Sequence, residues 1–134
     1  MQAAAAGGNA TVSQVVHPDF EQRSVLARFP GTDPSLPLVV LGAHLDSINM
    51  FNESQGRSPG ADDDGSGTVV LLEALRVLSA ARFQPRNPVE LQWYAAEEVG
   101  LRGSADIANR YREQGASVFG MMQVRRSTTP ADEG

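Results

Sequence analysis

The feature that most constrains the fold is an uninterrupted apolar run at residues 38–43 (LVVLGA). A short run without polar residues predicts a strand buried on both faces, which is typical of strands inside parallel sheets. Residues 89–95 and 117–124 predict two further strands. Residues 24–29 alternate between two sets of side chains and predict another strand, which we expect at an edge of the sheet.

Helical patterns lie between these strands. Residues 66–82 predict a helix that Ser66 or Asp64 caps, and its apolar positions cover more than one stripe, so we expect it to be largely buried. A second helix is predicted from Gly103 to Gln114. Strands that alternate with helices predict an α/β fold with a mostly parallel twisted sheet and helices on both faces.

Composition narrows the partners and the chemistry. The chain has 134 residues and a formal net charge of -5, so nucleic acid is not an expected partner. It has no cysteine, so any bound metal must be held by His, Asp or Glu. No apolar run is long enough to span a bilayer, and no signal peptide is visible. Residues 1–11 and 125–134 are expected to be disordered tails.

Three consecutive carboxylates, Asp62, Asp63 and Asp64, stand in a glycine-bracketed turn just before the first predicted helix. Neighbouring negative charges repel one another, so the cluster needs a positive partner. The N-terminus of the helix is one candidate partner, and a metal ion is the other. The turn alone does not decide between them.

Two further groups of ligand-type residues follow predicted strands. His44 and Asp46 come directly after the first strand described above, and Glu97 and Glu98 come after the second. In sheets of this kind, ligands bind at the carboxyl ends of the strands. Alone, each group is better explained as a loop histidine, a helix cap or a solvated turn. Together they predict a two-metal hydrolytic site, in which one carboxylate bridges the ions and another acts as the base.

Three other residues that could carry chemistry are assigned structural roles. We expect Trp93 and Tyr94 in the core rather than in contact with a substrate. His17 has no partner that the sequence indicates, so a surface position is its default interpretation.

The stretches that carry the candidate ligands match a known pattern. They are VLGAHLDS at residues 40–47, PGADDDGSGT at 59–68 and WYAAEEVGLRGS at 93–104. In their order and spacing they resemble the M28 zinc aminopeptidases, and most closely the secreted leucine-aminopeptidase-like members of fungi and bacteria. The resemblance covers residues 12–124 and corresponds to the N-terminal portion of the catalytic domain. It implies a zinc-peptidase, phosphorylase/hydrolase-like fold that is truncated at its C-terminal side.

The resemblance implies a role for each of five residues. His44 resembles a ligand of one zinc, Glu98 a ligand of the other, and Asp63 the carboxylate that bridges both. Glu97 resembles the general base, and Asp46 resembles the residue that orients the histidine ligand. The peptide bond after the bridging aspartate is typically cis in this family, which implies a cis bond after Asp63.

The same resemblance implies an activity. With two Zn2+ ions bound, such a site releases N-terminal residues from peptides or proteins that have a free N-terminus. The resemblance also implies secretion, which the glycosylation patterns at Asn9 and Asn52 support weakly. Some members of the family are glutaminyl cyclases instead, and the sequence leaves both activities open.

Two departures from the family pattern favour an alternative function. A further aspartate ligand of the family falls where this chain has Arg125, and a guanidinium group repels a cation. The last histidine ligand of the family would fall beyond Gly134. The alternative is a truncated, catalytically inactive metal-binding or interaction domain, whose sheet would have an uncovered edge.

Overall fold

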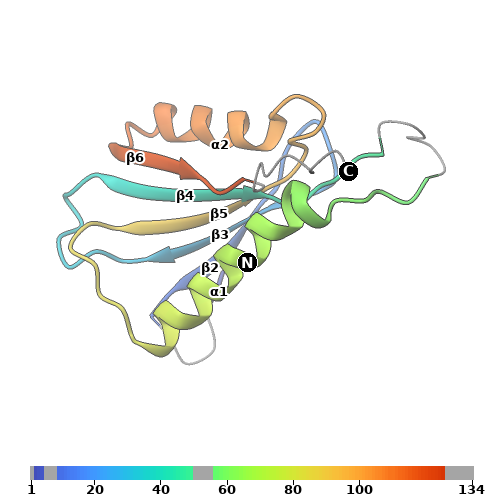
Figure 1. Ribbon diagram of the computed structural model, residues 1–134. Helices are drawn as coiled ribbons and strands as arrows, with labels where there is room; N and C mark the ends of the chain where they lie inside the picture. The colour runs from blue at the N-terminus through green and yellow to red at the C-terminus, as the bar shows by residue number, and fades with distance from the viewer. Residues whose placement is uncertain (1, 5–8, 50–55, 126–134) are drawn as a thin grey trace.

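A six-stranded sheet forms the centre of the computed structural model, which describes residues 2–4, 9–49 and 56–125 (Figure 1). Its strands lie in the order β1-β2-β3-β5-β4-β6. They are β1 (Gln2–Ala4), β2 (Thr11–Val15), β3 (Ser24–Phe29), β4 (Leu38–His44), β5 (Val89–Tyr94) and β6 (Val118–Gln123). Every strand that the sequence predicts is present, with ends within about one residue of those expected from its pattern.

The sheet is mixed, so the expectation of a mostly parallel sheet is only partly correct. β4 pairs in parallel with both β5 and β6. β3 pairs antiparallel with β5 on one side and with β2 on the other, and β2 pairs antiparallel with β1. The connection between β2 and β3 is too short for a parallel crossover, which explains the antiparallel pairing. β3 is therefore an interior strand, not the edge strand that we expected.

Two helices cover opposite faces of the sheet (Figure 1). α1 (Gly67–Ala80) follows a short helical turn, η1 (Ala61–Ser66), and packs Leu71 against one face. α2 (Arg102–Glu113) packs Ile107 against the other face. These helices, with the sheet between them, confirm the predicted α/β class.

The expectation that α1 is largely buried is wrong. Val69 and Val70 on its outward side are 62% and 54% exposed, and Leu72 and Val77 are about half exposed as well. Only one side of the helix faces the sheet, and no other described element packs on the opposite side. The apolar residues of the second stripe therefore face solvent.

The two faces of the sheet differ in chemistry. The face under α1 is an apolar core that includes Ala27, Phe29, Ala43, Leu91 and Trp93. The face under α2 holds a buried polar network instead. There the Gln92 amide donates to Glu90 at 2.5 Å, Tyr111 donates to the same carboxylate, and Tyr94 donates to the Gln92 carbonyl at 2.6 Å. Trp93 and Tyr94 are therefore core residues, as expected.

β6 forms one edge of the sheet as the structure describes it. Its side chains Phe119 and Met122 are 77% and 64% exposed. This is the uncovered edge that the truncated family pattern implies.

The expected disorder of residues 1–11 is wrong for part of that segment. Gln2–Ala4 pairs with β2, and Thr11 is the first residue of β2, so main-chain hydrogen bonds order both. Residues 1, 5–8 and 126–134 lie outside the described residues. In the described part of the chain, no helix is both long and apolar enough to cross a membrane.

Candidate metal centre

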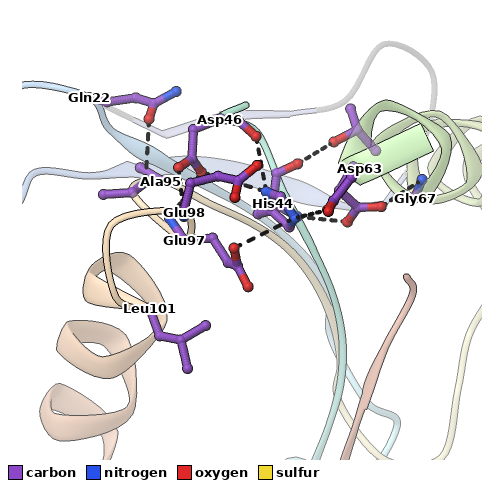
Figure 2. A network of polar contacts seen from close by, with 12 residues as sticks. Gln22, His44, Asp46, Asp63, Gly67, Ala95, Glu97, Glu98 and Leu101 are labelled. Atoms are coloured by element: carbon purple, nitrogen blue, oxygen red, sulfur yellow. Dashed lines mark hydrogen bonds and ion pairs between the residues drawn. The ribbon is translucent and has the colours of Figure 1, made fainter. Parts of the chain in front are cut away.

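The candidate site lies at the carboxyl ends of β4 and β5. The register of these strands pairs His44, the last residue of β4, with Tyr94, the last residue of β5. Glu97 and Glu98 follow β5 closely, and η1, which carries Asp63, lies against β4. In Figure 2 the side chains of the two glutamates, the aspartate and the histidine converge on one region. The sequence prediction that these groups meet at one sheet edge is therefore correct.

The three consecutive carboxylates lie in three different environments. Asp64 is buried, and its carboxylate accepts the main-chain N–H groups of His44 and Gly67, each at 3.1 Å. The side chain of Asp63 is 50% exposed, and its Oδ1 lies 3.1 Å from His44 Nε2. Asp62 is exposed. Asp64 thus accepts from Gly67, the first residue of α1, and Asp63 faces the histidine, while Ser66, the other expected cap, makes no side-chain hydrogen bond to the helix start.

The start of α1 packs closely against the end of β4. A Cβ atom on Gly67 would lie 2.3 Å from Asp64 Oδ1, so only glycine leaves room for this carboxylate. The Thr68 hydroxyl donates to the main-chain carbonyl of His44 at 2.9 Å. The peptide bond between Asp63 and Asp64 is cis, as the resemblance implies. These contacts fix the position of Asp63 relative to the histidine.

His44 is buried, and its ring is held in one orientation. Its Nδ1 donates to the main-chain carbonyl of Asp46 at 3.0 Å, so Nε2 faces Asp63. Burial of the ring lowers the pKa of His44. The nearby carboxylate of Glu97 and the hydrogen bond to the Asp46 carbonyl outweigh burial and raise the pKa above its usual value. The carboxylates around Nε2 therefore favour a positive charge at this position, which either a proton or a metal ion can supply.

Asp46 connects the two strand ends. Its carboxylate oxygens accept the main-chain N–H groups of Glu97 and Glu98, each at 3.0 Å. The same carboxylate lies 3.7 Å from His44 Nδ1, which is beyond a hydrogen bond, whereas the Asp46 carbonyl lies at 3.0 Å. Asp46 thus contacts the histidine through its main chain and holds the two glutamates through its side chain.

Three donor groups meet at the centre of the site. One ligand atom each from His44, Asp63 and Glu98 lies within 4.8 Å of the other two. Glu97 Oε2 lies 3.8 Å from His44 Nε2, beside this group (Figure 2). Burial and the nearby carboxylate of Asp63 raise the pKa of Glu98, so a cation placed here would relieve the repulsion. One imidazole and two carboxylates are ligands that zinc accepts, so this donor set fits the metal.

Arg125 follows β6 at the same edge of the sheet. The register pairs Gly42 of β4 with Gln123, and the Val124 N–H donates to the Gly42 carbonyl at 2.8 Å. Arg125 is the second residue past the end of β6, and the register of β6 with β4 ends at the pair Gly42 and Gln123. Arg125 is exposed.

His17 is not a surface residue, and the default interpretation of the sequence is wrong here. Its ring contacts Asp106 at 2.6 Å and Ser24 at 2.8 Å, and its side chain is fully buried. Asp106 lies 89 positions and Ser24 seven positions away along the chain. No short-range pattern could have indicated a contact between β3, α2 and the loop before β3.

The two glycosylation patterns have different outcomes. The Asn9 amide nitrogen donates to the Phe83 carbonyl at 2.7 Å, so the atom that would carry a glycan is engaged in the folded chain. Asn52 lies outside the described residues, as does most of the first half of the long loop that contains it.

Comparison with known proteins finds related sequences. Peptidase family M28 matches residues 24–125. The leucine aminopeptidase 1 of Penicillium rubens is 45% identical over 126 residues, which cover 91% of this chain and 32% of that protein. The chain thus spans about a third of the length of the curated relatives that it matches.

Solved structures share the fold. LapA of Legionella pneumophila has a TM-score of 0.77 at 33% identity, covering 90% of this chain and 32% of that chain. BSAP, described as a zinc aminopeptidase from Bacillus subtilis, has a TM-score of 0.53 at 31% identity, covering 69% of this chain and 21% of that one.

Proposed function

Since the chain belongs to peptidase family M28, we propose that its sheet edge binds zinc and serves an aminopeptidase, which releases N-terminal residues from peptides. The observation that carries the proposal is the meeting of His44, Asp63 and Glu98 within 4.8 Å, with Glu97 beside them. The names of the relatives, leucine aminopeptidase and zinc aminopeptidase, support the same activity.

The donor groups can be divided between two zinc ions. In this assignment His44 and Asp63 would hold one ion, Asp63 and Glu98 would hold the other, and Asp63 would be shared between them. The side chain of Asp63 is 50% exposed. This supports a bridging role, because a bridging carboxylate needs both of its oxygens accessible. Asp64, which is buried and already accepts two N–H groups, is left as the residue that builds the turn.

The residues of this chain would divide the work of peptide hydrolysis. When bound, zinc supplies Lewis acidity, which polarises the scissile carbonyl and acidifies water. Glu97 Oε2 takes the proton of the attacking water and later gives it to the leaving amine, while the C–N bond breaks. Asp46 holds the main chain of Glu97 so that its carboxylate stays beside the metal position.

Substrates in this proposal are peptides or proteins with a free N-terminus, rather than nucleic acids or membranes. The fungal relatives are leucine aminopeptidases, so a leucyl peptide is the first substrate to test. Secretion is proposed on the same resemblance.

A second candidate function is a metal-binding or interaction domain without catalysis. One observation favours it: Arg125, an exposed cation, lies two residues past the end of β6, which pairs with the strand that ends in His44. A positive side chain there weakens zinc binding and supplies no ligand.

The test is a zinc titration of the purified chain by calorimetry, beside Asp63→Ala and the matched variant Asp62→Ala. The proposal expects the wild type and Asp62→Ala to bind zinc alike, with a stoichiometry that counts the ions, and Asp63→Ala to lose binding. Release of leucine from a leucyl peptide, lost in Glu97→Gln with zinc still bound, supports the peptidase. Zinc binding without hydrolysis supports a metal-binding domain without catalysis. The absence of zinc binding by a folded wild type contradicts every metal-binding role and leaves only the interaction domain.

A further inference from the structure

The loop between β2 and β3, residues 16–23, is fastened to α2 and to the end of β5. We propose that His17, with Ser24 and Asp106, forms a positioning network for the segment that carries Glu97 and Glu98. This inference rests on the proposed function, because it assigns these three residues to the same metal site without any contact between them and the metal.

The network is a directional chain of hydrogen bonds. The Arg110 guanidinium, with the hydrogen bond from His17, holds the pKa of Asp106 below its usual range, so this carboxylate is ionised and accepts from His17 Nδ1 at 2.6 Å. The opposite ring nitrogen lies 2.8 Å from Ser24 Oγ. That hydroxyl accepts the main-chain N–H of Ala95 at 3.0 Å. The chain of bonds therefore begins on α2 and ends on the residue directly after β5.

A serine, a histidine and an aspartate in this order suggest a nucleophile, but the surroundings exclude that role. Ser24 is fully buried in β3, and its oxygen is already engaged by the Ala95 N–H. A substrate carbonyl cannot reach a hydroxyl oxygen that has no exposure to solvent. The same burial makes the group suitable as a rigid support.

The segment that the network holds needs support, because its backbone is unfavourable. Ala96 has a φ of 54°, the left-handed region that side chains other than glycine rarely adopt. Its N–H donates to the Gln22 amide oxygen at 3.4 Å, and Gln22 belongs to the same loop. On the other side, Gly103 packs so closely that a Cβ atom would lie 2.2 Å from the Ala95 carbonyl oxygen. Glu97 and Glu98 follow at once.

The loop is itself anchored to α2 at further points. The His17 and Phe20 rings stack with centroids 4.5 Å apart, and the Arg102 guanidinium lies 5.2 Å from the Phe20 centroid. Arg110, which binds Asp106, also donates to the Val16 carbonyl at 2.6 Å. Loop, helix and strand end thus form one unit, and the direction of the two glutamates depends on it.

The experiment compares three variants of the full chain. His17→Phe keeps a ring against Phe20 but removes both hydrogen bonds. Ser24→Ala removes only the hydroxyl. Tyr111→Phe is the control. Tyr111 lies on α2, as Asp106 does, and the change removes its hydrogen bond to Glu90 of β5, away from the loop. Amide hydrogen exchange is measured by NMR in the metal-free chain.

The main-chain N–H groups of Glu97 and Glu98 donate to Asp46. In His17→Phe and Ser24→Ala we expect them to exchange about tenfold faster than in the wild type, after each rate is divided by that of the β4 amides in the same sample. In Tyr111→Phe the exchange rates of the Glu97, Glu98 and β4 amides should all change by the same factor. If the two glutamate amides keep pace with β4 in both network variants, the positioning role is wrong. The β4 amides also report folding, so a variant that unfolds is recognised and the milder Ser24→Ala decides.

A second readout separates this inference from the proposed function. Zinc titration of the same proteins should show binding about tenfold weaker in the network variants than in Tyr111→Phe. A wild type that binds no zinc would overturn the proposed function, while the exchange data still decide whether the network holds the glutamates. Zinc binding of equal strength in all four proteins would overturn the positioning role.

Discussion

The two halves of the candidate site are held in different ways. His44 and Asp63 are fixed by contacts between the end of β4 and the start of α1, which join positions 20 and 24 residues apart in the chain. Glu97 and Glu98 are fixed from a distance, by the side chain of Asp46 on one side and by the loop before β3 on the other. The first half can be built by a local segment, whereas the second half requires the complete sheet.

The largest effect is expected from Asp64→Ala, which breaks the first half. The change leaves the main-chain N–H groups of His44 and Gly67 buried without their acceptor, so the free energy of unfolding should fall by about 3 kcal/mol. Chemical denaturation measures this. Asp62→Ala, at an exposed position, should stay within about 0.5 kcal/mol of wild type. Equal stability of the two variants would show that the buried carboxylate does not support the turn.

The next largest effect is expected from Asp46→Ala, which separates the halves. The N–H groups of Glu97 and Glu98 lose their acceptor, and zinc affinity should fall about 10- to 100-fold with a smaller loss of stability. Calorimetry in zinc gives the affinity. Asp33→Ala is a suitable control, because Asp33 also accepts a main-chain N–H, from Ser35 in a turn. A similar loss of affinity in both variants would contradict the linking role.

Arg125→Asp should sharpen the site by giving it a further ligand. Because Arg125 lies just past the end of β6, which pairs with β4 beside the site, an aspartate there should tighten zinc binding about tenfold or more. Arg125→Ala removes the charge without adding a donor, and should tighten binding only a few-fold. If the alanine and aspartate variants bind zinc equally, the position supplies repulsion in the wild type but no place for a ligand.

The smallest expected effect is a pH dependence that changes sign with metal. His44 has a raised pKa in the folded chain, so its contribution to stability is complete below about pH 6.5 and is lost as the pH rises through the folded value. The raised pKa of Glu98 acts in the same direction at lower pH. In a chelator, thermal unfolding should therefore show a slightly less stable chain at pH 8 than at pH 6, by roughly 1 kcal/mol or less.

Saturating zinc should reverse this slope, because the ligands bind metal only when deprotonated. The two titrations, with and without zinc, use the same protein and serve as controls for each other. Parallel pH profiles would mean that the metal does not bind at His44.

The sequence alone predicts the first half of the site well. The apolar run of β4, the acidic turn and the helix pattern after it are all local, and they give the order and ends of the elements directly. The pattern could not tell Asp63 from Asp64, because the distinction depends on which carboxylate points under the strand end. Only the resemblance separated them, and the structure places them in different environments.

The second half was predictable only in part. Glu97 and Glu98 follow a recognisable strand, but the support by His17, Ser24 and Asp106 joins positions far apart in the sequence. The interior position of β3 was missed for a related reason. Alternation along a strand reports which faces are buried, not which strands lie at its sides.

The place of β5 in the sheet has a consequence for how the chain acquires its structure during synthesis. β5 lies between β3 and β4, yet it comes after both in the sequence. When β3 and β4 have left the ribosome, β3 can pair with β2 on one side only, and β4 has neither of its partners until residues 89–94 emerge. Non-local pairing of this kind makes folding slow relative to translation of a short segment. Arrival of β5 then joins β3 to β4 and delivers the two glutamates in the same step, so the second half of the site is added to a first half that the chain has already synthesised.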